Sequence, residues 1–341
     1  MTLTYKASRA RLLAGTSIAA LFMAAGASVA QAQTSVSVEG GIPCPFGDQQ
    51  KIAGTHVFYY GLYSHATTNK LGNANCGGWT GRVGLMQEKS GTFLGLDYWG
   101  IFVRHSEHKS FAFSGSKATT FYGGAYQALL GTDGRYKEDR TVVDFEVGKD
   151  IGIGSAANLR AIAGLRYARQ SSRTSLGTTT FDSYLGITTS TSVRINNSFE
   201  GLGPRLGLVA ELPISSGIRL RLGGSGSILW GDHSSSGNVS GSCAPTCTNP
   251  TSLALNQSNG SVTNLEGEAA LVFAMPNLNG AELSLGVRGE TWYQIGGPSQ
   301  ISLQTTAGTA LTVSTAVGAA GSLDRNEWGP FLRLKVPLTA P

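Results

Sequence analysis

The sequence has few charged residues: Lys, Arg, Asp and Glu make up 14% of its 341 residues, against ~25% in ordinary soluble domains. After residue 32 it has no stretch approaching the ~18 consecutive apolar residues of a transmembrane helix. No basic stripe with interleaved aromatic residues is present, so we expect no nucleic-acid partner. Glycine, in contrast, is abundant, with 47 residues. These features favour a β-rich protein over a helical membrane protein.

The N-terminal segment is organised like a secretory signal peptide. Its first eleven residues include three basic residues and no acidic one, and residues 12–27 are apolar and small. A small-x-small cleavage motif ends at Ala32, and cleavage after Ala30 fits almost as well. We expect residues 1–32 to be removed on export and residues 33–341 to form one domain. The exported chain then has 23 basic and 21 acidic residues, a net charge of only +2.

The segment 142–169 (VVDFEVGKDIGIGSAANLRAIAGLRYAR) permits two interpretations. Residues 152–157 match the G-x-G-x-x-A turn that seats a dinucleotide on a helix. With a period of two, however, the apolar residues after this turn share one face and Arg160 and Arg166 share the other. The residues before the turn alternate in the same way, with Asp144 and Glu146 on the polar face. We therefore predict a β-hairpin and no nucleotide cofactor.

The same alternation recurs along the chain in segments that are mostly 10 to 15 residues long. A tilted strand needs ~9–11 residues to cross the hydrocarbon layer of a membrane. The predicted strands are Thr34–Ile42, Trp79–Glu88, Thr92–Arg104, Arg140–Ile151, Ala157–Gln170, Phe199–Leu212, Gly217–Trp230, Thr263–Met275, Ala281–Gln294 and Asn326–Leu338.

Short and long connections alternate strictly between these strands. The short ones are rich in Gly, Pro, Asn or Ser, and the long polar ones fall near residues 43–78, 105–139, 171–198, 231–262 and 295–325. Short periplasmic turns and long extracellular loops are typical of a transmembrane antiparallel β-barrel. We predict this all-β fold with about 10 strands. Two strand-like segments, Thr55–Tyr63 and Ala118–Leu130, would extend the walls above the membrane, fold inward as a plug, or add a pair to give 12 strands; we favour extension.

The charged side chains lie on the strand face opposite the apolar side chains. An Arg or Lys on the lipid face would cost ~2–4 kcal/mol at the midplane of the membrane, which favours an inward orientation. The predicted pore-lining residues are Arg82, Asp144, Glu146, Arg160, Arg166, Arg205, Arg219, Arg221, Glu266, Glu268, Glu282, Arg288, Glu290, Arg333 and Lys335. Aromatic residues near strand ends are expected to form girdles at the membrane surfaces; they are Trp79, Tyr98, Tyr167, Trp230, Tyr293 and Trp328.

Four segments occur in an order that resembles the Legionella major outer-membrane-protein family of pore-forming barrels. They are Asp144–Gly148, Ala163–Ala168, Phe199–Gly207 (FEGLGPRLG, the most specific) and Leu265–Glu268. The resemblance runs from about Val36 to Leu338. It implies a barrel in the cell outer membrane with porin-like activity and no catalytic residues. Outer-membrane lipid, lipopolysaccharide, the barrel-assembly machinery and small solutes or ions are the partners to expect, and no oligomeric state is specified.

The C-terminal end departs from the pattern of such barrels. They usually end in an aromatic residue that the assembly machinery recognises, whereas this chain ends Val336-Pro337-Leu338-Thr339-Ala340-Pro341. Phe331 or Leu338 would have to serve instead.

The four cysteines of an exported chain predict two disulfides, Cys44–Cys76 and Cys243–Cys247. A zinc site is the alternative, but no His lies close in sequence to either pair. We expect neither a metal nor a cofactor.

The sequence predicts a porin-like barrel that passes small polar solutes or ions through a narrow lumen of mixed charge, and not an enzyme. One alternative is a protease or lipid deacylase of the outer-membrane barrel type, for which His105-Ser106-Glu107-His108 and Asp232-His233 would be candidate residues. The other alternative is an adhesion or structural barrel that acts through its external loops.

Overall fold

The computed structural model shows the described residues almost entirely in β-strands. The described part of the chain contains no helix long and apolar enough to cross a membrane. The residues described are 33–45, 52–60, 63–70, 78–88, 96–121, 126–153, 157–182, 187–244, 258–295, 300–307, 311–319 and 324–338.

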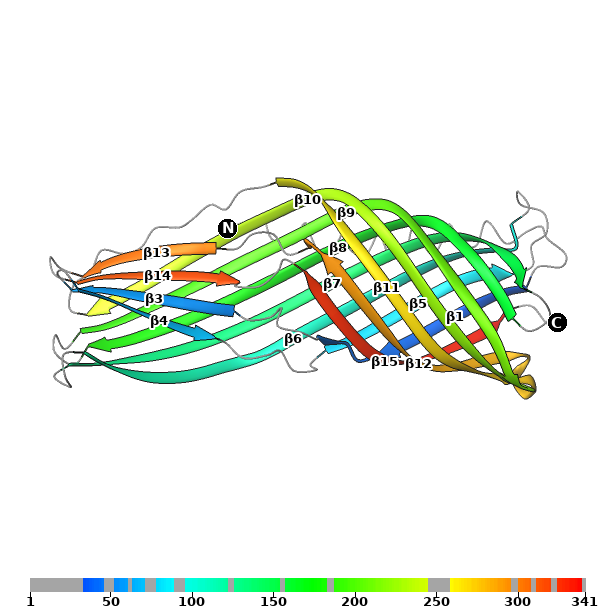
Figure 1. Ribbon diagram of the computed structural model, residues 1–341, viewed down its shortest axis with the longest axis horizontal. Coiled ribbons are helices and arrows are strands. Elements are labelled where there is room, and N and C mark those ends of the chain that lie inside the picture. The colour runs from blue at the N-terminus through cyan, green and yellow to red at the C-terminus, as the bar shows by residue number, and fades with distance from the viewer. Residues whose placement is uncertain are drawn as a thin grey trace, which may run out of the picture.

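Within these residues, ten antiparallel strands close into a barrel, as predicted (Figure 1). Each strand pairs with the next along the chain, and β1 pairs with β15 to close the sheet. The strands are β1 (Gln33–Gly41), β5 (Gly78–Glu88), β6 (Tyr98–Phe121), β7 (Tyr126–Ile153), β8 (Ala157–Asp182), β9 (Ile187–Ser215), β10 (Ile218–Ala244), β11 (Ser258–Met275), β12 (Ala281–Tyr293) and β15 (Arg325–Pro337). A closed sheet has no unpaired edges, which is what the hydrocarbon layer requires.

The short connections lie together at one end of the barrel, called here the turn end. The segment 142–169 contributes a hairpin of this kind, since β7 and β8 pair antiparallel from Ile153↔Ala157 onwards. A dinucleotide turn would instead lead from a strand into a helix. The β9–β10 connection turns at Gly217, whose φ of 92° falls in the left-handed region that glycine adopts without strain.

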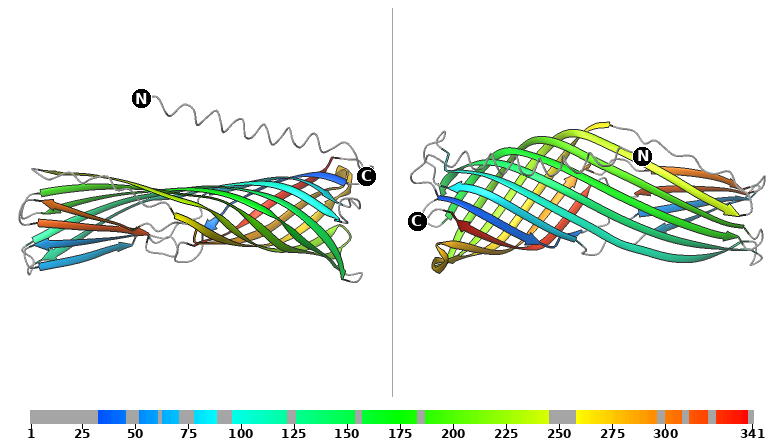
Figure 2. Two further views of the ribbon diagram at one scale, coloured as in Figure 1. Left: turned by 90° about the horizontal axis from the view of Figure 1, so that it is seen from above. Right: turned by 180° about the vertical axis from the view of Figure 1, so that it is seen from behind.

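At the opposite end, called here the extended end, β6 to β10 continue well beyond the other barrel strands (Figures 1 and 2). These five strands are 24 to 29 residues long. Much of the predicted loop segments 105–139, 171–198 and 231–262 is therefore strand, and the prediction of loops there was wrong. Segments 171–198 and 231–262 are rich in Ser, Thr and Gly, so the alternation that reveals a membrane strand is absent there. The expected wall extension by Ala118–Leu130 is confirmed, because it contributes to both β6 and β7.

The other ambiguous segment, Thr55–Tyr63, lies outside the barrel wall. It belongs to a separate four-stranded sheet in the order β13-β14-β3-β4. Its strands are β3 (Ile52–Tyr60), β4 (Tyr63–Lys70), β13 (Gln300–Ala307) and β14 (Leu311–Ala319). This sheet stands at the extended end beside the long strands (Figure 2). A short strand, β2 (Cys44–Pro45), pairs with β15.

Apolar residues form the outer surface of the barrel wall. Leu206, Leu285 and Leu332 are more than half exposed, as expected of side chains that face lipid. Four of the predicted girdle residues (Trp79, Trp230, Tyr293 and Trp328) also lie exposed on this surface. Tyr98 does not: it is only 5% exposed and packs with Met86 and Phe102. Its assignment to a girdle was wrong, because Tyr98 shares its strand face with Phe102 and Arg104, which are buried inside the barrel.

Candidate functional site: the barrel lumen

A buried ion pair occupies the centre of the lumen. Asp144 on β7 and Arg166 on β8 are direct cross-strand partners. The Arg166 guanidinium donates hydrogen bonds of 2.6 and 2.9 Å to the two carboxylate oxygens of Asp144. It also donates at 2.9 Å to Glu266, which lies on β11 across the lumen. Arg166 is fully buried, so these acceptors replace the water that its charge has lost.

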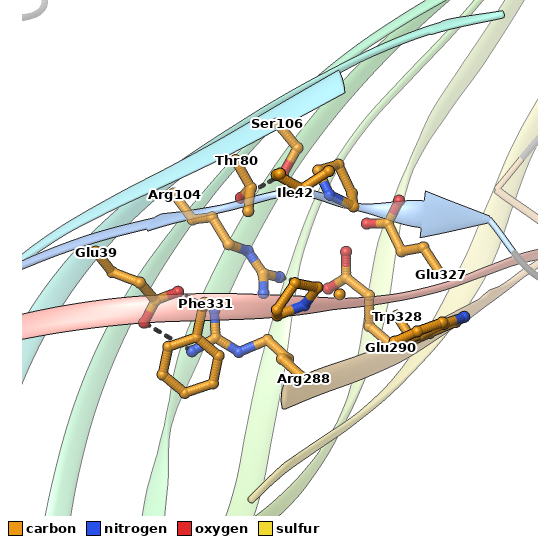
Figure 3. Close-up of a pocket in the computed structure, with 13 residues that line it drawn as sticks. Glu39, Ile42, Thr80, Arg104, Ser106, Arg288, Glu290, Glu327, Trp328 and Phe331 are labelled. Atoms are coloured by element: carbon orange, nitrogen blue, oxygen red, sulfur yellow. Dashed lines mark hydrogen bonds and ion pairs between the residues drawn. The ribbon is translucent and has the colours of Figure 1, made fainter. Parts of the chain in front are cut away.

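Beside this pair, β1, β11, β12 and β15 supply a second group of charges. Glu39 accepts a hydrogen bond of 3.0 Å from Arg288 and one of 2.8 Å from Arg333. The same two guanidinium groups donate at 2.7 and 2.8 Å to Glu268. Figure 3 shows Glu39 and Arg288 reaching toward one another from β1 and β12. Two cations and two anions therefore balance within this group.

A third group lies toward the extended end. Glu290 on β12 accepts a hydrogen bond of 2.6 Å from Arg104 on β6, and Figure 3 shows both side chains. Arg140 on β7 forms an ion pair of 2.9 Å with Glu290 and also contacts Glu327 on β15. These contacts connect strands on different sides of the barrel, so they span the lumen.

The ion pairs at the turn end of the lumen are more exposed than those at its centre. Arg160 donates at 2.7 Å to Asp150 and at 3.2 Å to Glu88. Lys335 donates at 2.7 Å to the other oxygen of Glu88. Arg219 contacts Glu282, and its side chain is about one third exposed. The exposure of charge therefore increases from the centre of the lumen to this mouth.

An apolar layer packs beside the charged groups of the lumen. Trp292 on β12 is fully buried, and the ζ-carbons of Arg140 and Arg166 lie 5.0 and 5.9 Å from its ring centroid. Six other buried apolar residues complete the layer, which is called here the Trp292 layer; they are Val142, Ala168, Phe199, Leu229, Val262 and Ile295. The layer draws on strands β7 to β12, so it covers the lumen from several sides.

Small cavities lie among the lumen charges of the described residues. One, of about 50 Å³, is lined by Arg82, Arg205, Arg221 and Glu268 among others. The second, of about 30 Å³, is lined by Arg104, Glu290 and Glu327 and is the pocket of Figure 3. Each exceeds the roughly 10–15 Å³ that one water molecule needs, and the polar linings supply hydrogen-bond partners. Neither is large enough for an organic solute.

All fifteen residues predicted to line a pore contribute side chains to this network, and each makes an ion pair. Their role in conduction stays a prediction. Of the expected cross-strand partners, Asp144–Arg166 and Arg221–Glu268 do pair. Arg219 instead pairs with Glu211 and Glu282, because the tilt of the strands brings Glu282 closer than Glu266.

The pore-lining residues predicted from the sequence did not include several residues that the structure places in the lumen. They are Glu39, Glu88, Arg104, Arg140, Trp292 and Glu327. Strand alternation could have found most of them. Glu39 shares its face with Ser35 and Ser37, and Trp292 shares its face with Arg288 and Glu290. The sequence of β12 alone does not indicate that Trp292 contacts apolar residues from other strands.

The segment His105–His108 does not form a cluster, because alternate residues of a strand face opposite sides. Outside the barrel, the ring of His105 lies 5.3 Å from that of Trp79, and Glu107 accepts a hydrogen bond from Trp79. Ser106 and His108 face inward and are buried. In the described part of the chain, no group of three His, Cys, Asp or Glu side chains is placed to hold a metal ion.

The two buried histidines of these motifs lie just beyond the outward tryptophans, toward the extended end. Burial, together with the charges of Arg325 and Arg140, lowers the pKa of His108 to about 4. Burial also lowers the pKa of His233, which Asp232 opposes, and its ring packs 4.8 Å from that of Phe199. Both imidazoles are therefore neutral at physiological pH.

The predicted disulfides lie only partly within the described residues. Cys44 forms the start of β2, while Cys76 and Cys247 fall outside the described residues. The pairings Cys44–Cys76 and Cys243–Cys247 stay predictions, as does the signal peptide at residues 1–32.

A closed antiparallel barrel with an apolar outer band and a charged interior defines the class of outer-membrane β-barrel proteins. Within that class, the chain belongs to the family described as Legionella pneumophila major outer membrane protein precursor, whose model matches residues 93–289. The family membership suggested by the sequence motifs is thereby confirmed. No curated protein matches the sequence.

Three solved structures are similar to the chain in fold. The outer membrane protease OmpT from Escherichia coli has 10% identity and a TM-score of 0.40, covering 90% of this chain and 97% of that one. The Ralstonia pickettii toluene transporter TbuX has 8% identity and a TM-score of 0.28, covering 89% and 90%. A Pseudomonas aeruginosa FadL homologue has 9% identity and a TM-score of 0.21, covering 91% of each chain. At these identities and TM-scores, the likeness supports no conclusion about this chain.

Proposed function

We propose that the protein is a narrow pore that is closed in this structure and passes small ions or polar solutes when the Trp292 layer rearranges. The observation that carries the proposal is the composition of the lumen. Charged side chains line the lumen from the turn end to Glu138 and Arg325, which pair at 3.0 Å. Arg140, 4.0 Å from Glu138 and 2.9 Å from Glu290, makes this series continuous. The Trp292 layer packs against this series, with its ring 5.0 Å from the ζ-carbon of Arg140, and narrows the lumen there.

The charged lumen supports a pore over a purely structural barrel. Removing ions from water is costly, and well-packed apolar residues are often neutral or stabilising replacements for a buried ion pair. A barrel that served only as an anchor would gain nothing from the many ion pairs in its lumen. In a conducting lumen, the same groups supply polar contacts to water and ions.

The mixed charge of the lumen supports low conductance and weak selectivity. Rings of charge of one sign set the selectivity of many channels. Here each of the three central groups contains both signs, such as Arg166 with Asp144 and Glu266. Opposite charges joined across the lumen narrow it and leave little net charge to favour anions or cations.

The test is a conductance recording in planar bilayers with the refolded full-length protein. The wild type should give small, infrequent openings. Trp292→Ala removes the largest side chain of the Trp292 layer and should increase the open probability or the unit conductance several-fold. Trp230→Ala is the matched control, since Trp230 is 59% exposed on the outer surface; it should leave the conductance unchanged.

Two outcomes would contradict the proposal. If the wild type and Trp292→Ala are both silent although gel mobility shows folded barrels, ions do not pass through this lumen. If Trp230→Ala raises the conductance as much as Trp292→Ala does, the effect reflects a general loosening of the barrel rather than an opening of the lumen.

A second candidate places the function on the extended end. The continuation of β6 to β10 beyond the barrel gives a large external surface, which supports adhesion or catalysis on external substrates. Incubation of the purified barrel with peptide and lipid A substrates tests the protease or deacylase alternative. Substrate turnover by a barrel that does not conduct would favour this second candidate over the pore.

A further inference from the structure

Four basic side chains are exposed on the outer face of the extended strands. They are Arg135 and Lys137 on β7, Arg173 on β8 and Arg194 on β9, and together they are called here the basic patch. The three strands are neighbours in the sheet. By strand alternation, these residues continue the face that carries Phe145 and Leu165 nearer the turn end, where it faces lipid.

The register places like charges side by side. Lys137 lies directly opposite Arg173. Two residues further along β8, away from the turn end, Ser175 lies between Arg135 on β7 and Arg194 on β9. Like charges in direct cross-strand positions destabilise a sheet. Lys137 is balanced by Glu107 at 3.4 Å and Asp139 at 3.2 Å, whereas Arg173 donates at 2.9 Å to the neutral amide of Asn196. Among the side chains that the structure describes, Arg135, Arg173 and Arg194 therefore leave an excess of positive charge, which an anionic ligand would stabilise.

The level of the basic patch indicates which anion it meets. Tyr167 is the last residue of the apolar band on β8, and Arg173 follows it by six residues. At ~3.3 Å per residue and a strand tilt of about 40°, Arg173 lies ~15 Å beyond the edge of the hydrocarbon. Phospholipid headgroups occupy only about 5–7 Å on each side of the hydrocarbon core. Phosphates at the level of the basic patch must therefore be carried on a larger headgroup.

We propose that the basic patch binds phosphate groups on the core saccharide of lipopolysaccharide in the outer leaflet. Guanidinium groups bind phosphate through paired, charge-assisted hydrogen bonds, and three of the four residues are arginines. Nearer the membrane, Arg169 is already placed beside Glu200, at 3.9 Å, and Tyr167 donates to the same carboxylate at 2.8 Å. The unbalanced charge thus begins only above the level of the lipid phosphates.

The test compares lipid binding by the wild type and the triple variant Lys137→Ser, Arg173→Ser, Arg194→Ser, both as folded full chains in micelles. Three lipids serve as probes: lipopolysaccharide with a phosphorylated core, lipid A without the core, and phosphatidylglycerol. The wild type should prefer the core-bearing lipopolysaccharide. The triple variant should bind it about tenfold more weakly, a loss of ~1.4 kcal/mol, and should bind the other two lipids as the wild type does.

Lys149→Ser is the matched control. Lys149 is also on the outer face of β7, at the turn end, and its side chain is 57% exposed; its replacement should leave lipopolysaccharide binding unchanged. The proposal is overturned if the triple variant binds core-bearing lipopolysaccharide as tightly as the wild type. It is also overturned if lipid A without the core, or phosphatidylglycerol, binds the wild type equally well. Because the basic patch lies outside the lumen, the triple variant should conduct as the wild type does, which separates this test from that of the pore.

Discussion

Asp144 and Arg166 face each other on neighbouring strands in the middle of the lumen, joined by two hydrogen bonds of 2.6 and 2.9 Å. Without its partner on the other strand, each of these residues would be a buried charge with one compensating charge fewer. The pair forms because the register of β7 and β8 places the two residues opposite one another. The stability of the barrel and the closure of its lumen therefore depend on the same contacts.

Replacing Asp144 by Asn should destabilise the barrel by about 3–5 kcal/mol, because Arg166 stays buried with one compensating charge fewer. The midpoint of urea unfolding in micelles measures the loss. Glu200→Gln is the control: it disrupts the exposed pair of Arg169 and Glu200, 3.9 Å apart, and should cost less than ~1 kcal/mol. Equal losses in the two variants would show that burial does not govern the strength of these pairs.

Replacing Arg219 and Arg221 by Glu should shift the selectivity of the open pore toward cations. Both arginines contact Glu211, and they also reach Glu282 and Glu268, respectively, near the turn end. The variant replaces two positive charges with two negative ones and removes both arginine contacts of Glu211. Glu268 keeps Arg288 and Arg333, and Glu282 keeps Lys335. Reversal potentials under a salt gradient measure the shift. An unchanged reversal potential in a conducting variant would mean that the ions do not pass these side chains.

Acidification should destabilise the extended side of the lumen through His108. The folded state holds the pKa of His108 at about 4, below its usual value of about 6.5. A depressed histidine pKa means that the neutral form contributes stability above pH ~6.5, and that this stability is lost as pH falls toward 4. We expect a loss on the order of 2 kcal/mol, and His108→Asn should remove that part of the pH dependence.

Urea unfolding between pH 4 and 7 tests the role of His108. His105→Asn, on the outer face of the same strand, is the matched control for loss of a histidine. A His108→Asn variant with the same pH profile as the wild type would assign the acid sensitivity to other groups.

The disulfides should be Cys44–Cys76 and Cys243–Cys247. A bond that closes a loop of about 30 residues can contribute ~3–4 kcal/mol by restricting the unfolded chain. Peptide mapping without reductant should recover both cross-linked pairs. Recovery of Cys44 joined to Cys243 or Cys247 would disprove the proposed connectivity, and reduction of the correct pairs should lower the unfolding midpoint.

The sequence by itself determined the ten strands and the face that each charge takes. A strand that crosses a membrane must present apolar residues to lipid at every second position, so Leu165 and Arg166 could be assigned to opposite faces without a structure. The same rule did not apply beyond the membrane. There both faces are polar, the alternation disappears, and the long continuations of β6 to β10 were mistaken for loops.

Only the tertiary structure decided which side chains meet inside the barrel. Glu39 and Arg288 are 249 residues apart in sequence, and they pair because β1 and β12 both adjoin β15 in the closed sheet. The Trp292 layer likewise needs six strands to bring its apolar residues to one level. Strand alternation reports the direction of a side chain, whereas the contacts across a lumen depend on how the strands tilt, shift in register and close.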